Sequence, residues 1–279
     1  MSKNATRLRE LLMALPGPGA LLPGIDPASM PGVKDRKGAE REVQDTASQL
    51  ASLQERLWAE QRHSVLLVLQ GMDTSGKDGT IKHVFRGLNP VSIDVASFQR
   101  PTEEERRHHF LWRVERHLPR PGQIVIFNRS HYEDVVAVPV QHLEPEEIWQ
   151  PRFDEINEFE RKVTDSGTSI LKVFLHISYD EQRKRLLARL EDPDKQWKFD
   201  EQDIEQRAKW AEYQAAYETA ISRCHSEDAP WVVVPADRKW YRNWAVARLL
   251  FETLQDLDPK YPRPHLDVEA LKARLAPPN

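Results

Sequence analysis

The sequence has few cysteines and no long apolar run, the features on which disulfide bonds, cysteine-based metal sites and membrane-spanning helices depend. Cys224 is the only cysteine among 279 residues, so neither an intrachain disulfide nor a cysteine-based metal cage can form. No apolar run approaches the length that a membrane-spanning helix needs. The one segment resembling a signal peptide, residues 11–22, is interrupted by Pro-Gly-Pro-Gly at positions 16–19. We therefore expect a cytoplasmic protein with no membrane partner.

An excess of positive charge is also missing. The formal net charge is -4, with 30% charged and 39% hydrophobic residues, a composition typical of a globular protein. A negative total argues against general nucleic-acid binding, so we expect no nucleic-acid partner. Any polyanion would have to be held by a local cluster of Lys and Arg.

Short apolar runs alternate with segments of helical periodicity. The strand-like runs cover residues 64–70, 91–98, 123–128, 169–178 and 231–236. Helical spacing is found at residues 37–60, 102–118, 145–166, 180–190, 200–223 and 241–257. Continuous apolar runs of this length are typical of buried parallel strands. The alternation predicts an α/β fold in three layers, with a five-stranded parallel sheet and helices on both faces.

A glycine-rich segment directly follows the first predicted strand. Residues 71–80 read GMDTSGKDGT, and Gly71, Gly76 and Lys77 fit G-x-x-x-x-G-K, whose backbone N–H groups wrap phosphate oxygens. The alternative is an ordinary strand-to-helix turn with a surface lysine, which the placement between strand and helix disfavours. The predicted phosphate-binding residues of this loop are Gly71, Met72, Thr74, Ser75, Gly76, Asp78, Gly79 and Thr80.

The two aspartates of this segment differ in interpretation. Asp78 stands where the usual pattern has Ser or Thr to help hold Mg²⁺, and helix capping remains an alternative for it. Asp73 lies within the loop, where a carboxylate beside phosphates would be repelled unless a cation lies between them or it orients an acceptor. We therefore expect Asp73 to serve Mg²⁺, the predicted cofactor, or the acceptor.

Polar residues follow the third predicted strand, at the sheet edge where α/β proteins bind ligands. Asn128 takes the place where a Walker B strand usually ends in aspartate. Arg129 presents a guanidinium suited to bidentate contact with phosphate. Glu133 and Asp134 could supply the missing carboxylate. The alternative is a polar turn that starts a helix.

A basic segment follows the fourth predicted strand. Residues 183–198 read RKRLLARLEDPDKQWK, and Pro193 ends the helix and allows a mobile connection. Such a segment suits a lid, at about residues 183–212, that closes over phosphates and excludes water. A solvated charged helix is the alternative.

Taken in order, these motifs resemble the family-2 polyphosphate kinases. The resemblance is carried by IDPASMPGVKDRKGAE, GMDTSGKDGTIKHVF, PTEEERRHHFLWR, FNRSHYEDV, ARLEDPDKQWKF and APWVVVPADRKW. It implies a thymidylate kinase-like P-loop fold with a helical lid, and a homo-oligomer. It also implies Mg²⁺-dependent, reversible transfer between polyphosphate and nucleotides, from AMP to ADP and from ADP to ATP. Adenine nucleotides are the expected partners, and guanine nucleotides stay open.

The resemblance also assigns roles by position. It implies as catalytic residues Asp73, Lys77, Asn128, Arg129 and Arg189. Lys77 would bind the transferred phosphoryl group and Asp73 would serve Mg²⁺ or the acceptor phosphate. Since phosphoryl transfer is largely placement and charge neutralisation, we expect direct in-line transfer with no phosphorylated residue.

Further contacts are expected around the substrates. Cations expected to hold polyphosphate are Lys82, Arg113 and Lys198, and for Lys82 the alternative is a surface lysine with no ligand. Residues expected at the nucleotide are Glu133, Asp134 and Arg185. The motif around Asn128 is similar to the subgroup that acts on both nucleoside mono- and diphosphates. His109 stands where the family pattern has an acid and Pro139 where the subgroup often has arginine, so substrate preference stays open.

Other organisations and functions also remain to be tested. The expected division is an N-terminal extension and helix packed on the core (1–60), a P-loop kinase domain (61–258) and a C-terminal tail (259–279). An ATP-dependent nucleoside or nucleotide kinase would share the loop and the lid. A P-loop regulator and a polyphosphate-storage module are further alternatives, although the lack of an NKxD motif argues against a GTPase.

Overall fold

The computed structural model describes residues 6–14 and 21–275. A parallel sheet with the strand order β2-β3-β1-β4-β5 lies at its centre. The strands are β1 (Ser64–Gln70), β2 (Ile93–Ser97), β3 (Ile124–Asn128), β4 (Thr168–His176) and β5 (Trp231–Pro235). The predicted five-stranded parallel sheet is therefore confirmed.

The position of each strand explains its composition. β1 is buried along its whole length, because β3 and β4 pair with its two edges and helices cover its two faces. β2 lies at the sheet edge and leaves Asp94 and Val95 exposed. This difference is why the first apolar run is continuous and the run around β2 is weaker.

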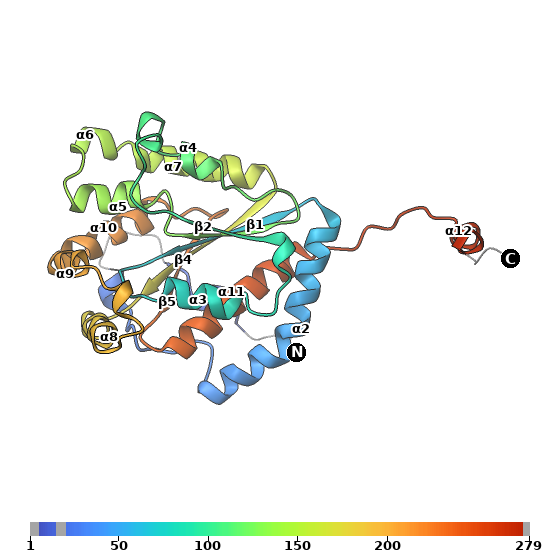
Figure 1. Ribbon diagram of the computed structural model, residues 1–279, viewed down its shortest axis with the longest axis horizontal. Coiled ribbons are helices and arrows are strands. Elements are labelled where there is room, and N and C mark those ends of the chain that lie inside the picture. Colours follow the sequence, from blue (N-terminus) through green and yellow to red (C-terminus); the bar gives the residue numbers. More distant parts are fainter. Residues whose placement is uncertain (1–5, 15–20, 276–279) are drawn as a thin grey trace.

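Helices cover both faces of the sheet (Figure 1). Helices α2 (Arg36–Glu60), α3 (Lys77–Val84) and α11 (Lys239–Leu257) lie on one face, and α5 (Glu133–Val140), α7 (Arg152–Asp165) and α10 (Trp210–Arg223) lie on the other. The remaining α-helices are α1 (Leu8–Leu12), α4 (Trp112–Glu115), α6 (Glu146–Trp149), α8 (Tyr179–Glu191), α9 (Gln202–Ala208) and α12 (Val268–Leu275). Short 3₁₀ helices are η1 (Leu22–Gly24), η2 (Pro90–Ser92), η3 (Glu105–Arg107) and η4 (Gln196–Lys198). This arrangement confirms the three-layer α/β prediction.

The predicted helix over residues 102–118 is wrong. Only η3 and α4 form there, joined by a turn. Leu111 and Val114 enter the core, and the Arg113 guanidinium donates to the Gln99 carbonyl oxygen at 2.8 Å. These tertiary contacts fix the path of the segment and override its local helical periodicity.

Two other predicted helices are each interrupted. The 145–166 segment forms α6 and α7, with Pro151 between them, because proline has no N–H to continue the hydrogen-bond ladder. The 200–223 segment forms α9 and α10, which meet at Lys209. The Lys209 ammonium donates to the Val140 carbonyl oxygen at 2.9 Å and ties this junction to α5.

The first sixty residues contribute to the same core as the rest of the chain. Leu8 and Leu12 of α1 are buried, and α2 packs against α11. The tail runs away from the body and ends in α12 (Figure 1). The division at residues 60 and 258 stays a prediction, and the Pro-Gly-Pro-Gly interruption lies outside the described residues. In the described ranges, no helix combines the length and apolarity needed to span a membrane.

Candidate active site

The glycine-rich loop turns the chain from the carboxyl end of β1 into α3. Its backbone has positive φ at Gly71 (146°), Thr74 (65°) and Gly76 (102°), conformations that favour glycine. Gly76 is the residue before the first turn of α3. The unpaired N–H groups of that turn therefore face the sheet edge, where a phosphate can accept their hydrogen bonds.

Lys77 is buried within this loop. Its ammonium donates to the Gly71 carbonyl oxygen at 2.8 Å and lies 3.5 Å from the Met72 carbonyl oxygen. Burial lowers the pKa of Lys77, and the Arg129 charge lowers it further, against the opposing effect of Asp73. A phosphate group would supply the negative charge that this buried ammonium lacks.

Arg129 reaches the loop from the end of β3. Its backbone has a φ of 62°, and its Nη2 donates to Asp73 Oδ1 at 2.7 Å. The charges of Glu133 and Asp73 raise the pKa of Arg129, so its guanidinium, on a side chain that is 36% exposed, stays charged. The structure thus brings together the predicted strand-end cation and the predicted loop carboxylate.

Asn128 and Asp78 form a second link between β3 and the loop. Asn128 Nδ2 donates to Asp78 Oδ1 at 2.8 Å. Among the described residues this is the one hydrogen bond that the Asp78 carboxylate accepts, so it makes no capping hydrogen bond to α3. Its carboxylate lies in the first helical turn, where the helix dipole favours negative charge.

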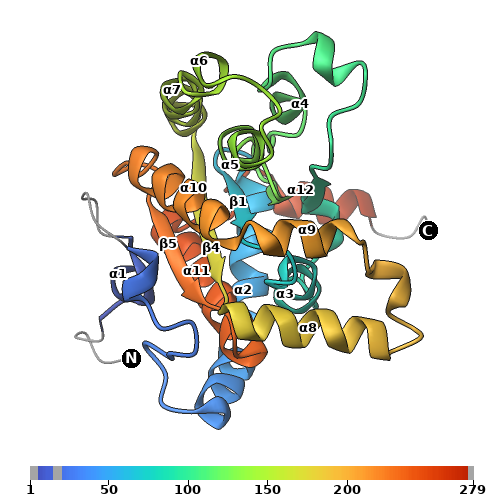
Figure 2. The same cartoon turned by 90° about the vertical axis from the view of Figure 1, so that its left-hand side faces the viewer.

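The predicted lid consists of α8, η4 and α9, and in Figure 2 its two α-helices lie on either side of α3. Arg189 Nη1 lies 3.3 Å from Asp203 Oδ2 and 3.4 Å from the Lys198 carbonyl oxygen. Burial raises the pKa of Asp203, and the charge of Asp73 raises it further. The lid arginine is therefore held by a lid carboxylate that is itself electrostatically coupled to the loop.

Three residues that were predicted to contact ligands have partners within the protein. Arg113 is 6% exposed, and its Nη2 lies 3.5 Å from Asp134 Oδ2. Arg152 lies 3.6 Å from the other oxygen of Asp134. Arg185 is also buried, and it donates to the carbonyl oxygens of Thr74 and Ser75. These intraprotein contacts position Arg113, Asp134 and Arg185, and the ligand contacts expected of the three residues stay predictions.

The remaining predicted cations are available to a ligand. Lys82 is exposed on α3, one turn beyond the loop. Lys198 is exposed at the lid tip, with its ammonium 4.9 Å from the centroid of the Trp197 ring. Both therefore stay candidates for holding polyphosphate.

The comparison with known families agrees with this geometry. The sequence model of the family Polyphosphate kinase 2 matches residues 33–262, most of the chain. The chain belongs to the polyphosphate kinase 2 family. A solved structure, the polyphosphate kinase 2 from Arthrobacter aurescens TC1, superposes with a TM-score of 0.92 at 40% identity and covers 98% of each chain. This likeness confirms the P-loop kinase fold that the motifs implied.

Two relatives of this polyphosphate kinase 2 chain carry names that describe their reactions. The AMP/ADP-polyphosphate phosphotransferase of Meiothermus ruber is 54% identical over 222 residues, which are 80% of this chain and 83% of the relative. The NDP-polyphosphate phosphotransferase 1 of Ruegeria pomeroyi is 33% identical over 210 residues, which are 75% of this chain and 68% of the relative.

Sequence reasoning missed other residues of this polyphosphate kinase 2 site. Gln70 is fully buried at the end of β1. In the amide orientation that satisfies both of its groups, it donates to Glu133 Oε1 and accepts from the Ser130 N–H, both at 3.1 Å. The sequence signal that could have identified Gln70 is its position as a polar residue at the end of an apolar strand. Asp203 gave no comparable signal, because it belongs to a charged helical segment.

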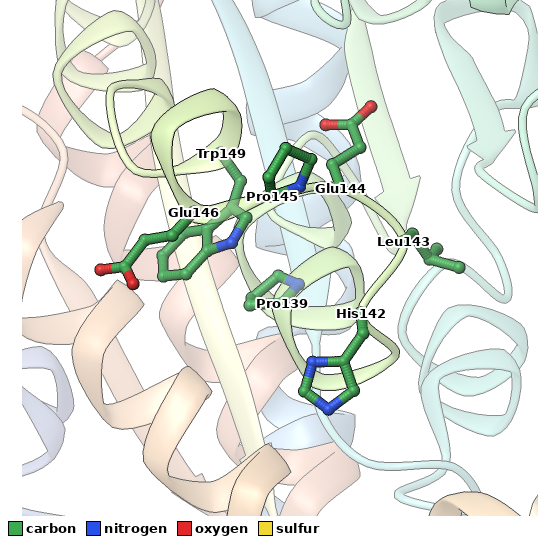
Figure 3. Close-up of a pocket in the computed structure, with 7 residues that line it drawn as sticks. All are labelled: Pro139, His142, Leu143, Glu144, Pro145, Glu146 and Trp149. Carbon is green, nitrogen blue, oxygen red and sulfur yellow. The ribbon is translucent and has the colours of Figure 1, made fainter.

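A hollow of about 490 Å³ lies at the other end of α5 from Glu133. Figure 3 shows the side chains around it, and its wall consists of Pro139, His142, Leu143, Glu144, Pro145, Glu146 and Trp149. None of these belongs to the phosphate loop or the lid. We therefore assign this hollow no part in phosphoryl transfer.

Substituting Gly71 by alanine should destabilise the fold far more than the same change at Gly87. Both residues have positive φ, 146° and 92°, so both variants lose about 1 kcal/mol to backbone strain. A Cβ at Gly71 would lie 2.7 Å from the Leu175 carbonyl oxygen, a backbone atom of β4, whereas nothing lies within 4 Å of a Cβ at Gly87. The clash adds about 1–3 kcal/mol. Urea unfolding measures the difference, and equal losses would contradict this packing.

Proposed function

We propose that this chain transfers a phosphoryl group from inorganic polyphosphate to AMP and ADP, reversibly and with Mg²⁺. The observation that carries the proposal is the convergence of Lys77 and Arg129 on a phosphate loop beneath a lid that bears Arg189. The name of the Meiothermus relative supports both acceptors.

The residues around the loop fit a magnesium ion that arrives with phosphates. Within residues 6–14 and 21–275, no group of three or more His, Cys, Asp or Glu side chains could hold a metal alone. Mg²⁺ usually keeps several waters and uses one or two carboxylates together with substrate phosphates. Asp73 would hold the ion, which neutralises phosphate charge when it is bound.

The chain's own groups position the reacting phosphates. Lys77 would exchange its loop carbonyls for the transferred group, and Arg129 would contact its oxygens from the strand end. Arg189 would leave Asp203 to contact the phosphates as the lid closes and excludes water. An oxygen of the terminal phosphate of AMP or ADP forms a new bond to the terminal phosphorus of polyphosphate. The bond from that phosphorus to its bridging oxygen breaks. The shortened polyphosphate leaves with that oxygen.

Substrate range, assembly and location are further parts of the proposal. Guanine nucleotides are proposed as additional acceptors, and the name of the Ruegeria relative, which specifies no base, supports this extension. We also propose a homo-oligomer in the cytoplasm. The buried free thiol of Cys224 fits a reducing compartment.

Chromatography of nucleotides tests the acceptors and the metal together. The pure protein is incubated with long-chain polyphosphate and either AMP or ADP, in Mg²⁺ or in excess EDTA. We expect ADP and then ATP from AMP, ATP from ADP, and no product in EDTA. Product from ADP alone would remove AMP as an acceptor, and undiminished product in EDTA would remove the magnesium requirement.

A further inference from the structure

Arg242 of α11 lies directly beneath the phosphate loop. It is 3% exposed, and its Nη1 donates to the Ser75 carbonyl oxygen at 3.1 Å. A Cβ on Gly76 would lie 1.7 Å from Arg242 Nη1, and a Cβ on Gly79 would lie 3.1 Å from Nη2. The guanidinium therefore occupies the space that both glycines leave free. Gly79 is inside α3, where glycine is otherwise unfavourable relative to alanine.

The charge of Arg242 has no carboxylate partner in the part of the chain that the structure describes. Among the residues that the structure describes, no Asp or Glu oxygen lies within 4.0 Å of its guanidinium. Its buried neighbour Arg185, by contrast, has Glu181 at 2.8 Å. Burial, with a contribution from Arg185, lowers the pKa of Arg242 to about 10, so Arg242 remains a cation at neutral pH.

The hydrogen bonds of Arg242 do not explain why a cation is buried at this position. The Ser75 carbonyl oxygen also accepts from Arg185 Nη1 at 3.1 Å. The other acceptor is Asn243 Oδ1, at 3.2 Å from Nε and 2.9 Å from Nη2, and Asn243 is partly exposed to water. Removing Arg242 would therefore leave no buried acceptor unpaired. A buried charge without a partner is itself unfavourable in the empty protein.

We propose that Arg242 is a positioning residue that acts through the phosphate loop, adding positive potential behind it and thereby strengthening its hold on phosphates. The bound phosphates supply the countercharge that the protein does not. Arg242 lies on the side of the loop that faces α11, so it contributes without touching the ligand. The inference rests on the proposed function only in that the loop takes up a chain of phosphates.

Thermal unfolding and calorimetric titration with tripolyphosphate test this role in the full-length protein. Arg242→Met keeps much of the side-chain volume and removes the charge. We expect its unfolding midpoint without ligand to equal or exceed that of the wild type, because an unpaired buried charge is gone. We expect its affinity for tripolyphosphate to fall roughly tenfold, the effect of one charge acting across the loop at an intermediate dielectric. Arg242→Lys should retain most of the affinity.

Arg248 offers a matched control on the same helix. Its guanidinium is paired with Glu42 at 2.5 Å and Glu252 at 2.9 Å. Arg248→Met should therefore lower the unfolding midpoint and keep the full tripolyphosphate affinity, the opposite pattern. An Arg242→Met protein that is less stable, that fails to fold, or that keeps its affinity would overturn the inference. Absence of tripolyphosphate binding by the wild type would instead count against the proposed function.

Discussion

Lys77→Ala should reduce the rate of polyphosphate-driven nucleotide phosphorylation by about 10²–10³-fold, the usual effect of removing one charge-stabilising donor from a transition state. The Lys77 ammonium is buried and, among the residues that the structure describes, contacts only loop carbonyl oxygens. Its role in the empty protein is therefore small, whereas its charge is needed when phosphate oxygens occupy the loop. Initial rates at saturating polyphosphate and ADP measure the loss.

The effect must be separated from a general loss of surface charge. Lys162 on α7 is 70% exposed and pairs with Glu158 on the surface of the same helix, so Lys162→Ala should keep the wild-type rate. The unfolding midpoint of Lys77→Ala should stay close to that of the wild type. A Lys77→Ala enzyme within tenfold of the wild-type rate would remove Lys77 from the transfer step.

Lys172→Met should lower the free energy of unfolding by about 3–5 kcal/mol, the usual result of breaking a buried ion pair. Lys172 is fully buried on β4, and its ammonium contacts Glu160 Oε2 at 2.5 Å, the Tyr132 hydroxyl at 3.0 Å and the Cys224 carbonyl oxygen at 2.5 Å. Without it, the Glu160 carboxylate stays buried with no ammonium partner. Urea unfolding at pH 7 measures the loss.

The pH dependence identifies the ion pair as the cause. Burial alone would raise the pKa of Glu160, but Lys172 and His131 lower it below its ordinary value of 4.5. The unfolded chain then binds this proton more readily, so the stabilisation is fully present above about pH 4.5 and is lost as the pH falls through the folded-state pKa. Adding Glu160→Gln to Lys172→Met should restore part of the stability at pH 7. A double variant less stable than Lys172→Met would contradict this account.

Apolar patterning predicted the sheet because every strand except β2 is buried. The run at residues 64–70 coincides with β1, whose two faces and two edges are all covered. The prediction of a helix over residues 102–118 failed because contacts between distant residues set the path of this segment. Arg113, for example, contacts the Gln99 carbonyl oxygen and Asp134. Hydrophobic periodicity contains no information about such distant partners.

For the candidate site, the sequence likewise predicted which segments come together but not which side chains pair. Parallel strands end at one edge, so the proximity of the loop after β1 to Arg129 after β3 followed from the fold. Which residue each charged side chain pairs with could not be predicted from the fold. Asp73 pairs with Arg129, Asp78 with Asn128 and Asp134 with Arg113, each across a long stretch of sequence. Nothing in the sequence singled out Arg242, which lies in a segment of helical periodicity.

The most direct test of the central claim is the choice of phosphoryl donor. Nucleotides are separated and quantified after AMP or ADP is incubated with the protein and Mg²⁺, with either long-chain polyphosphate or ATP as the only donor. We expect AMP to give ADP and ATP, and ADP to give ATP, with polyphosphate alone, and both reactions to be lost in Lys77→Ala. Conversion of AMP only when ATP is supplied, with no product from polyphosphate, would contradict the account and identify an ATP-dependent nucleotide kinase.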